Sequence, residues 1–117
     1  MILTGAIVST TAERFATLRD FYAGLFGDHV RTTREGFVSF EWPDLRLTVT
    51  LHSAIAGEAV EPQRVMLNFA TADIGQAFDL AVTLGARIVR RPVREHWGGL
   101  VATVADPDGN YIQFLEF

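Results

Sequence analysis

The chain contains no cysteine, and this absence excludes disulfide bonds and thiolate-ligated metal sites. Basic residues are also scarce. Ten Lys and Arg against 14 Asp and Glu give a net charge of −4, which argues against a general nucleic-acid-binding surface. No apolar run approaches the length that crosses a membrane, and the first residues lack the pattern of a secretory signal. We therefore expect a cytoplasmic protein that binds neither nucleic acid nor a membrane.

The residues that are present favour a single folded domain. The chain has 117 residues, 49% of them apolar, which is enough to build one core and argues against disorder. One basic run, Arg90-Arg91-Pro92-Val93-Arg94, stands out against the acidic balance. We interpret it first as a solvated loop and second as a segment that attracts an anionic ligand.

The last twelve residues carry the clearest local pattern, a turn followed by a strand. Asp106 can accept from the backbone two residues on, Pro107 presets φ, and Gly109 supplies the positive φ that closes the turn. In the strand that follows, Ile112 and Phe114 point to one face. The alternate positions point to the other face: Tyr111, Gln113, Leu115 and Phe117.

Both halves of the chain show one order of elements, a strand, a helix and three further strands. In the first half we expect strands over residues 2–9, 28–34, 37–42 and 45–52, with the helix after the first of them. In the second half we expect strands over 64–70, 86–93, 99–105 and 111–117, again with the helix after the first. Residues 53–63 lack periodicity and read as a connector. The sequence therefore predicts an α+β protein made of two βαβββ modules.

The ends of both helices carry capping residues. Thr10-Thr11-Ala12-Glu13 reads as a capping box whose first threonine is the N-cap. Gly27 is expected to end this helix in the left-handed conformation. The second helix is expected to start from Thr71 or Asp73 and to end at Gly85.

Several of these segments resemble the vicinal oxygen chelate superfamily. That group includes glyoxalase I, extradiol dioxygenases, fosfomycin-resistance enzymes and bleomycin-binding resistance proteins. Asp20-Phe21-Tyr22 and Leu25-Phe26-Gly27 look like the end of its first helix. Trp97-Gly98-Gly99 and Asp106-Pro107-Asp108-Gly109-Asn110 look like its closing hairpin. These motifs are turns and caps, so they indicate the fold more than the activity.

The resemblance implies a cup-shaped, partly open eight-stranded mixed sheet, with helices outside and a ligand inside. It also implies one glyoxalase/bleomycin-resistance-like domain over residues 1–117. Module one would span 1–53, the connector 54–63 and module two 64–117. Because members with a single cup commonly pair, we further expect a homodimer.

In metal-using members, four inward positions supply His, Glu or Gln to a divalent ion that acts as a Lewis acid. The corresponding positions here hold Gln113, Arg64, a residue of Gly5–Ile7, and Thr50, with His52 two residues farther along. No carboxylate is present among them, and a guanidinium would oppose a cation. We therefore expect no metal and no other cofactor.

The resemblance also suggests which residues face the ligand. His52 either lines the pocket or merely ends its strand, and Trp97 either stacks on a planar ligand or closes the rim. We assign His29 no role. The expected ligand-binding residues are Thr50, His52, Arg64, Asn68, Trp97, Tyr111 and Gln113.

Three functions are compatible with this pattern, and the first is favoured. It is metal-free binding of a small aromatic or anionic molecule, of the glyoxalase/bleomycin-resistance type. The second is an enzyme, either a metal-dependent lyase or dioxygenase or one that uses His52 as an acid–base without metal. The third is a self-associating domain without a catalytic role. We lean against an enzyme.

Overall fold

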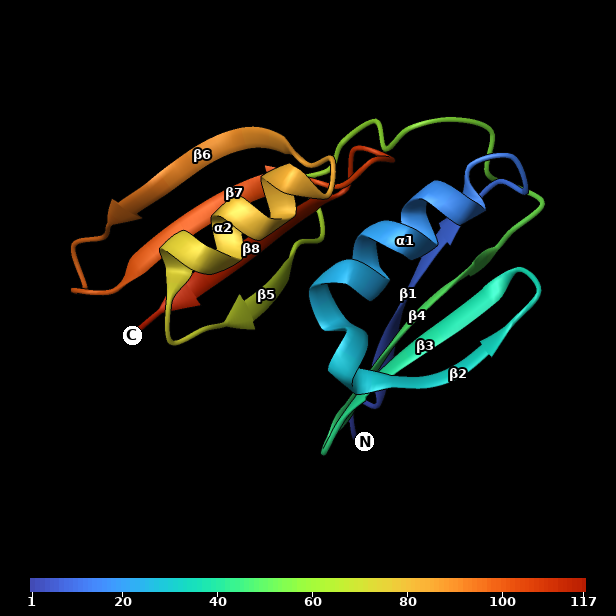
Figure 1. Ribbon diagram of the computed structural model, residues 1–117, viewed down its shortest axis with the longest axis horizontal. Coiled ribbons are helices and arrows are strands. Elements are labelled where there is room, and N and C mark those ends of the chain that lie inside the picture. Colours follow the sequence, from blue (N-terminus) through green and yellow to red (C-terminus); the bar gives the residue numbers. More distant parts are fainter. The chain divides into compact units, whose positions relative to one another are not determined.

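The computed structural model describes residues 1–117, which form two compact units, Met1–Gly57 and Glu58–Phe117 (Figure 1). The first unit contains β1 (Gly5–Thr10), α1 (Phe15–Phe26), the 3₁₀ helix η1 (Gly27–His29), β2 (Val30–Arg34), β3 (Phe37–Trp42) and β4 (Leu45–Leu51). The second contains β5 (Leu67–Ala70), α2 (Ile74–Thr83), β6 (Arg87–Arg94), β7 (Leu100–Ala105) and β8 (Tyr111–Glu116). The prediction of two βαβββ modules in an α+β protein is confirmed. We call the two units the first and second modules.

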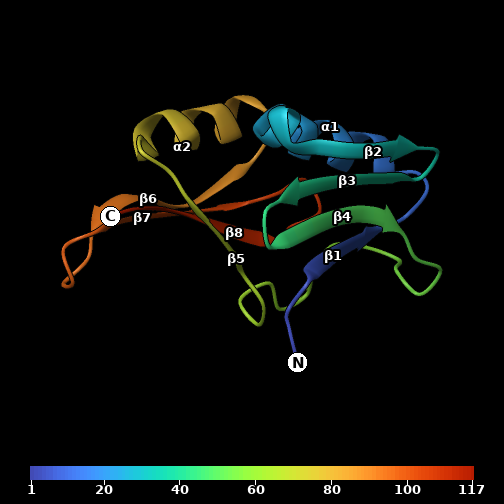
Figure 2. The same ribbon diagram turned by 90° about the horizontal axis from the view of Figure 1, so that it is seen from below.

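Each module folds around its own four-stranded mixed sheet. The strand order is β1-β4-β3-β2 in the first module and β5-β8-β7-β6 in the second. In both, the first strand pairs parallel with the last, and the other pairs are antiparallel. The helix of each module covers one face of its sheet (Figure 2). We call the opposite side of each sheet the helix-free face.

The core of the first module lies between α1 and its sheet. The alternation predicted in β4 is confirmed at the centre of the strand, where Leu47 and Val49 are buried. In β3, Val38 and Phe40 are buried as predicted, and Ser39 between them is buried as well. Such fully buried side chains each contribute about 1.5–3 kcal/mol to stability. The buried set is Phe15, Leu18, Phe21, Tyr22, Val38, Phe40, Leu47 and Val49.

The second module repeats this packing with α2. Ile74, Phe78 and Ala81 of the helix are buried, and so are Ile112 and Phe114 of β8. The predicted alternation of the last strand is therefore confirmed. Tyr111, Gln113 and Leu115, which alternate with these two β8 residues, consequently lie on the helix-free face.

The turn before β8 forms as predicted. The Oδ1 atom of Asp106 accepts from the backbone N–H groups of Asp108 (2.8 Å) and Asn110 (3.0 Å). Its Oδ2 accepts from the side-chain amide of Asn110 at 2.9 Å. Gly109 has φ +82°, a conformation that disfavours side chains with a Cβ. Because its carboxylate is occupied in this way, Asp106 is a structural residue.

The predicted capping box at the start of α1 is wrong. Thr10 belongs to β1, where it pairs with Leu51, and its carbonyl accepts from His52 N–H at 3.1 Å. The strand pairing therefore holds Thr10 in an extended conformation, and the helix begins only at Phe15. Thr11 provides part of the predicted capping instead, since its Oγ1 accepts from the backbone N–H of Arg14 at 3.3 Å.

The predicted left-handed end of α1 is also wrong. Gly27 has φ −54° and ψ −33°, and the chain continues through η1 to His29. The second helix follows the prediction at both ends. Asp73 is its N-cap and accepts from Gln76 N–H at 2.9 Å, and Gly85 has φ +107°.

The strand predicted over residues 64–70 begins later, at Leu67. Arg64 lies in a turn, where its N–H donates to the carbonyl of Glu61 at 3.1 Å. Likewise β2 begins at Val30, because η1 occupies the residues before it. No helix is long and apolar enough to span a membrane.

Candidate functional site

A row of polar residues crosses the helix-free face of the second sheet. Gln113 in β8 pairs with Asn68 in β5 and with Thr103 in β7. Thr103 pairs in turn with Arg90 in β6. Because paired residues on neighbouring strands share a face, these four lie in line across the whole sheet. We call them the polar row.

The middle of the polar row is ordered by a hydrogen bond. The Nε2 of Gln113 donates to the Oγ1 of Thr103 at 3.1 Å. Thr103 is only 5% exposed, whereas Asn68 is exposed. With its Nε2 engaged, Gln113 presents its Oε1 as an acceptor, and the Asn68 amide beside it can donate and accept. The pair is therefore suited to a ligand group that hydrogen-bonds in both directions.

The ends of the row differ in charge. Arg91 lies over the ring of Phe78 in α2, 6.0 Å from its centre, so Arg91 is on the helix face. The register of β6 shifts on both sides of Arg90, and Arg90 is assigned to the row by its pairing with Thr103. Arg90 forms an ion pair with Glu95 at 2.5 Å. The basic run is thus a strand at the edge of the sheet, not a loop, and Arg90 brings a partly neutralised positive charge to the row.

The polar row is bordered by less polar side chains of the same face. Tyr111 and Leu115 lie two residues before and after Gln113 on β8, and both are half-buried. Val101 and Ala105 of β7, which pair with Leu115 and Tyr111, are buried. A small molecule could therefore pack against Tyr111 and Leu115 while it hydrogen-bonds to the row.

Trp97 lies away from Tyr111. It contacts Phe117 just beyond the end of β8, with 5.8 Å between ring centres, whereas Tyr111 begins that strand. Six residues of strand separate the two ends by about 20 Å. The Trp97 ring covers Gly99, where an added Cβ would fall 1.8 Å from a ring atom. The structure thus brings Asn68, Tyr111 and Gln113 together and leaves Trp97 apart.

The remaining predicted site residues have contacts of their own. Thr50 in β4 donates through Oγ1 to the carbonyl of Gly36 at 3.2 Å. His52 follows β4, and its Nδ1 accepts from Ala54 N–H at 3.0 Å. Arg64 is exposed and pairs with Glu61 at 2.9 Å. These contacts give each residue a local role in its loop or hairpin.

The side chains at the family's metal positions do not fit a divalent ion. Gln113 lies between an amide and a hydroxyl with no carboxylate in its row, Arg64 lies in a turn, and the Thr50 hydroxyl donates to the backbone. Neither module gathers three His, Asp or Glu side chains that could hold a metal. A hard cation stripped of water would find too few oxygen ligands here.

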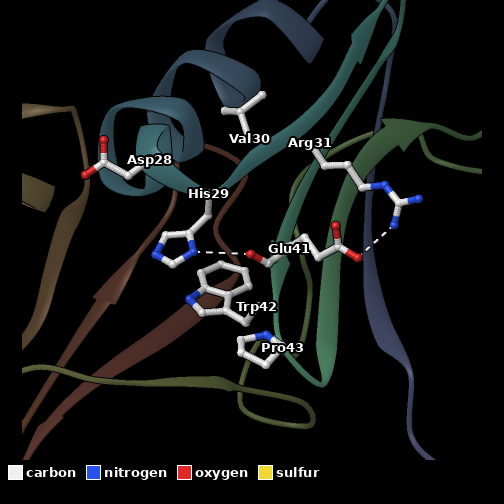
Figure 3. Close-up of a pocket in the computed structure, with 7 residues that line it drawn as sticks. All are labelled: Asp28, His29, Val30, Arg31, Glu41, Trp42 and Pro43. Atoms are coloured by element: carbon white, nitrogen blue, oxygen red, sulfur yellow. Dashed lines mark hydrogen bonds and ion pairs between the residues drawn. The ribbon is translucent and has the colours of Figure 1, made fainter.

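A second feature, which the sequence did not indicate, is a groove of about 550 Å³ in the first module (Figure 3). It lies where η1 runs into β2 beside the end of β3. The His29 imidazole stacks on the Trp42 indole, with ring centres 4.6 Å apart. The groove is lined by Asp28, His29, Val30, Arg31, Glu41, Trp42 and Pro43. We call it the η1 groove.

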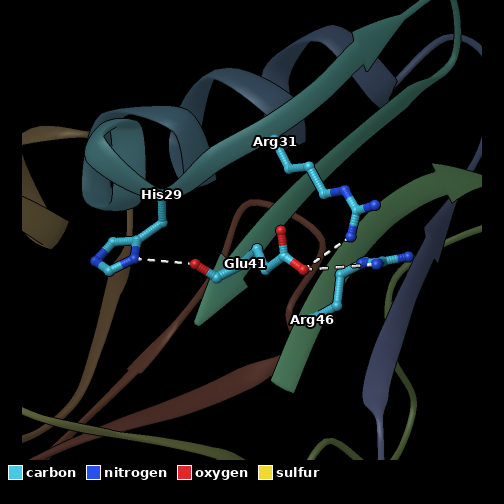
Figure 4. Close-up of polar contacts among 4 residues, drawn as sticks. All are labelled: His29, Arg31, Glu41 and Arg46. Atoms are coloured by element: carbon cyan, nitrogen blue, oxygen red, sulfur yellow. Dashed lines mark hydrogen bonds and ion pairs between the residues drawn. The ribbon is translucent and has the colours of Figure 1, made fainter. Parts of the chain in front are cut away.

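An ion-pair network borders the η1 groove on one side (Figure 4). One carboxylate oxygen of Glu41 lies 2.8 Å from Arg31 and 3.6 Å from Arg46. The backbone oxygen of Glu41 lies 3.2 Å from the Nδ1 of His29. Glu41 therefore holds both guanidinium groups with its side chain and the imidazole with its backbone.

His29 was given no role from the sequence, because a single histidine at a strand start carries no pattern. Its position depends on the unpredicted continuation of α1 into η1 and on contact with Trp42, 13 residues later. The one sequence feature that could have pointed to this groove is Trp42, which stands before the Pro43-Asp44 turn. An aromatic residue at such a position often belongs only to the hydrophobic core.

Comparison with known proteins gives one family. Residues 6–115 match the family described as glyoxalase-like domain. A glyoxalase/bleomycin resistance protein/dioxygenase family enzyme from Burkholderia phytofirmans PsJN superposes with a TM-score of 0.77 at 16% identity, covering 99% of this chain and 98% of that one. A glyoxalase/bleomycin resistance protein from Albidiferax ferrireducens T118 gives 0.74 at 20% identity, covering 98% of each chain.

A third solved structure, the lactoylglutathione lyase from Agrobacterium tumefaciens, gives a TM-score of 0.69 at 14% identity, covering 97% of this chain and 92% of that one. No curated protein matches the chain. At these identities the structural likeness shows the fold, and the names of the neighbours cover more than one activity. The chain therefore belongs to the glyoxalase-like domain family, and through it to the vicinal oxygen chelate superfamily.

Proposed function

We propose that the protein binds a small organic molecule, without a metal, on the helix-free face of the second module. The observation that carries this proposal is the polar row, in which Gln113 is held by Thr103 beside the exposed amide of Asn68. An ordered amide loses little conformational entropy when it binds, so such a site is prepared for a ligand. Thr50, His52, Arg64 and Trp97 stay predicted ligand contacts, but their local contacts give the proposal no added support.

The chemistry of the face suggests the kind of ligand. Asn68 and Gln113 together offer hydrogen-bond donors and acceptors, which complement an amide, a carbonyl with a neighbouring N–H, or a carboxylic group. Tyr111 and Leu115 offer an aromatic and an aliphatic surface on the same strand. We infer an aromatic or amide-bearing molecule held by sequestration, which is the role that the words bleomycin resistance in the neighbours' names suggest.

Bleomycin is a suitable first probe. We expect it to raise the melting temperature of the protein, since a ligand at about a hundred times its Kd adds about 2.7 kcal/mol to stability. Gln113→Ala and Asn68→Ala should each reduce that rise. Gln76→Ala is the matched control, because it removes the same kind of amide from the exposed surface of α2. If Gln76→Ala reduced the rise as much as Gln113→Ala, the polar row would not be the binding site.

A lyase is the second candidate, favoured by the likeness to lactoylglutathione lyase and by an amide at the family's C-terminal ligand position. It predicts formation or cleavage of lactoylglutathione when zinc, nickel or manganese is added, and loss of that turnover in Gln113→Ala. Such turnover would overturn the proposal of metal-free binding. Binding of bleomycin with no turnover at any metal concentration would support it.

We also propose that the protein is a homodimer. Large apolar side chains are exposed around β1, which is an edge strand with no charge and no proline along Gly5–Thr10. Such an edge readily pairs with another chain. The exposed residues are Met1, Ile2, Leu3 and Ile7. Light scattering at micromolar concentration should give twice the chain mass, and a monomer mass throughout would exclude the dimer.

A further inference from the structure

The η1 groove contains an imidazole whose orientation is fixed although it is exposed. The His29 ring lies nearly parallel to the Trp42 indole, at 23° between planes. The indole is itself held edge-on by Phe26, with ring centres 5.3 Å apart. His29 also contacts the backbone oxygen of Glu41. Stacking and hydrogen bonding together leave the ring little rotational freedom, so its second nitrogen points in a set direction.

The hydrogen bond of His29 identifies its tautomer. A backbone carbonyl can only accept, so the Nδ1–H of His29 donates to Glu41 at 3.2 Å. In the neutral ring the Nε2 atom is then an acceptor. His52 shows the opposite arrangement, because its Nδ1 accepts from Ala54 N–H. Of these two imidazoles, only that of His29 presents a lone pair on Nε2.

A carboxylate accompanies this acceptor. The Asp28 carboxylate and the Nε2 of His29 both project from η1 on the side away from Glu41 (Figure 3). No ion pair reaches Asp28, whereas the one guanidinium that lines the groove, Arg31, is held by Glu41. Two carboxylates and one guanidinium thus leave the lining with one net negative charge, at the Asp28 end. Arg46 lies on the far side of Glu41 (Figure 4).

We propose that the η1 groove is a second ligand site, for a planar organic cation such as an aromatic amidinium. The two N–H donors of an amidinium can bond side by side to Asp28 and His29, and its positive charge offsets that of the carboxylate. The flat ring of such a ligand can pack along the His29–Trp42 stack, where aromatic contacts and a cation near a π-face both stabilise. The groove volume of about 550 Å³ is large enough for a molecule of this size.

Benzamidine tests this site directly. In a Trp97→Phe background, Trp42 is the one remaining tryptophan, so its fluorescence reports on the groove. We expect saturable quenching or enhancement by benzamidine. Benzoate, which has the same shape and opposite charge, and neutral benzamide should have much weaker effects. Asp28→Asn should weaken benzamidine binding about two- to fivefold, the range of an exposed ion pair, and His29→Ala should weaken it further.

A matched control separates the site from general charge effects. Asp79→Asn removes one exposed carboxylate from α2 in the second module and should leave benzamidine binding unchanged. Three results would each overturn the proposal: a Trp42 response that does not saturate, equal binding of benzoate, or equal affinities of the Trp97→Phe protein with and without Asp28→Asn. Because the Asp28 side chain is exposed, its substitution should leave the fold intact, which circular dichroism would verify.

Discussion

The two modules share one order of elements but end their helices in opposite ways. After α1, Gly27 keeps the right-handed conformation at φ −54°, and the chain makes an extra turn through η1. After α2, Gly85 adopts φ +107°, and β6 begins two residues later at Arg87. Both glycines follow an amphipathic helix in the sequence. A glycine at a helix end can therefore adopt either the right-handed or the left-handed backbone conformation, and the surrounding contacts determine which one forms.

This difference has a chemical consequence. The extra turn places His29 against Trp42 and creates the η1 groove, whereas no 3₁₀ helix follows α2. The second module instead carries amides and a hydroxyl across its sheet, where Gln113 meets Thr103. The two modules thus share one fold but present different surfaces, because their loop and strand residues differ while the pattern of buried positions is the same.

The largest expected effect concerns the two faces of the second sheet. Phe114→Ala should lower the free energy of unfolding by about 3–5 kcal/mol, because it leaves a cavity against α2. Gln113→Ala should cost far less, since that side chain lies on the helix-free face and loses one hydrogen bond worth about 1 kcal/mol. Urea unfolding curves would measure both values. Equal losses would mean that the two faces are assigned the wrong way round.

The helix-end glycines give the most direct test of the comparison. A Cβ at Gly27 or at Gly85 would meet no atom within 4 Å, so only the backbone conformation distinguishes the two. Gly85→Ala should cost about 1–3 kcal/mol, because alanine is strained at that positive φ. Gly27→Ala should be neutral or stabilise by about 0.4–1 kcal/mol. Thermal melts would show a fall for the first variant and none for the second; the same shift in both would contradict the assigned conformations.

The helix starts should differ by a smaller amount. Asp73→Ala removes the side-chain cap of α2 and should cost about 1 kcal/mol. Thr11→Ala removes only a longer contact, 3.3 Å to the N–H of the N-cap residue Arg14, and should cost less. Denaturant midpoints of the two variants, compared with wild type, would check the order. A larger loss for Thr11→Ala would restore a capping role for the threonine pair.

The sequence was sufficient to predict the fold because its patterns are local. Alternation along Phe37–Trp42 and Leu45–Leu51 identified the apolar face of β3 and β4, whose central residues are buried, and the Asp106 turn carries its own hydrogen bonds. The start of α1 was missed because Thr10 and Thr11 are both acceptable caps. Only the pairing of Thr10 with Leu51, a distant contact, decides between them.

The candidate sites were less predictable for the same reason. Alternation placed Gln113 on the correct face, but its neighbours Asn68 and Thr103 follow from strand register, which one sequence does not specify. Arg64 was expected at a strand start, whereas its pairing with Glu61 holds a turn instead. His29 acquires its role from two rings and a carbonyl that the sequence pattern does not connect.

The parallel pairing of first and last strands has a consequence for synthesis on the ribosome. In the second module β5 has a single strand neighbour, β8, and the first N–H of α2, on Ile74, donates to Glu116, 42 residues later. While the chain emerges, β5 therefore lacks its strand neighbour, and Ile74 N–H lacks its acceptor, until β8 has been made. The first module can close as soon as β4 has emerged, so the two halves should acquire structure in sequence order, each at one late step.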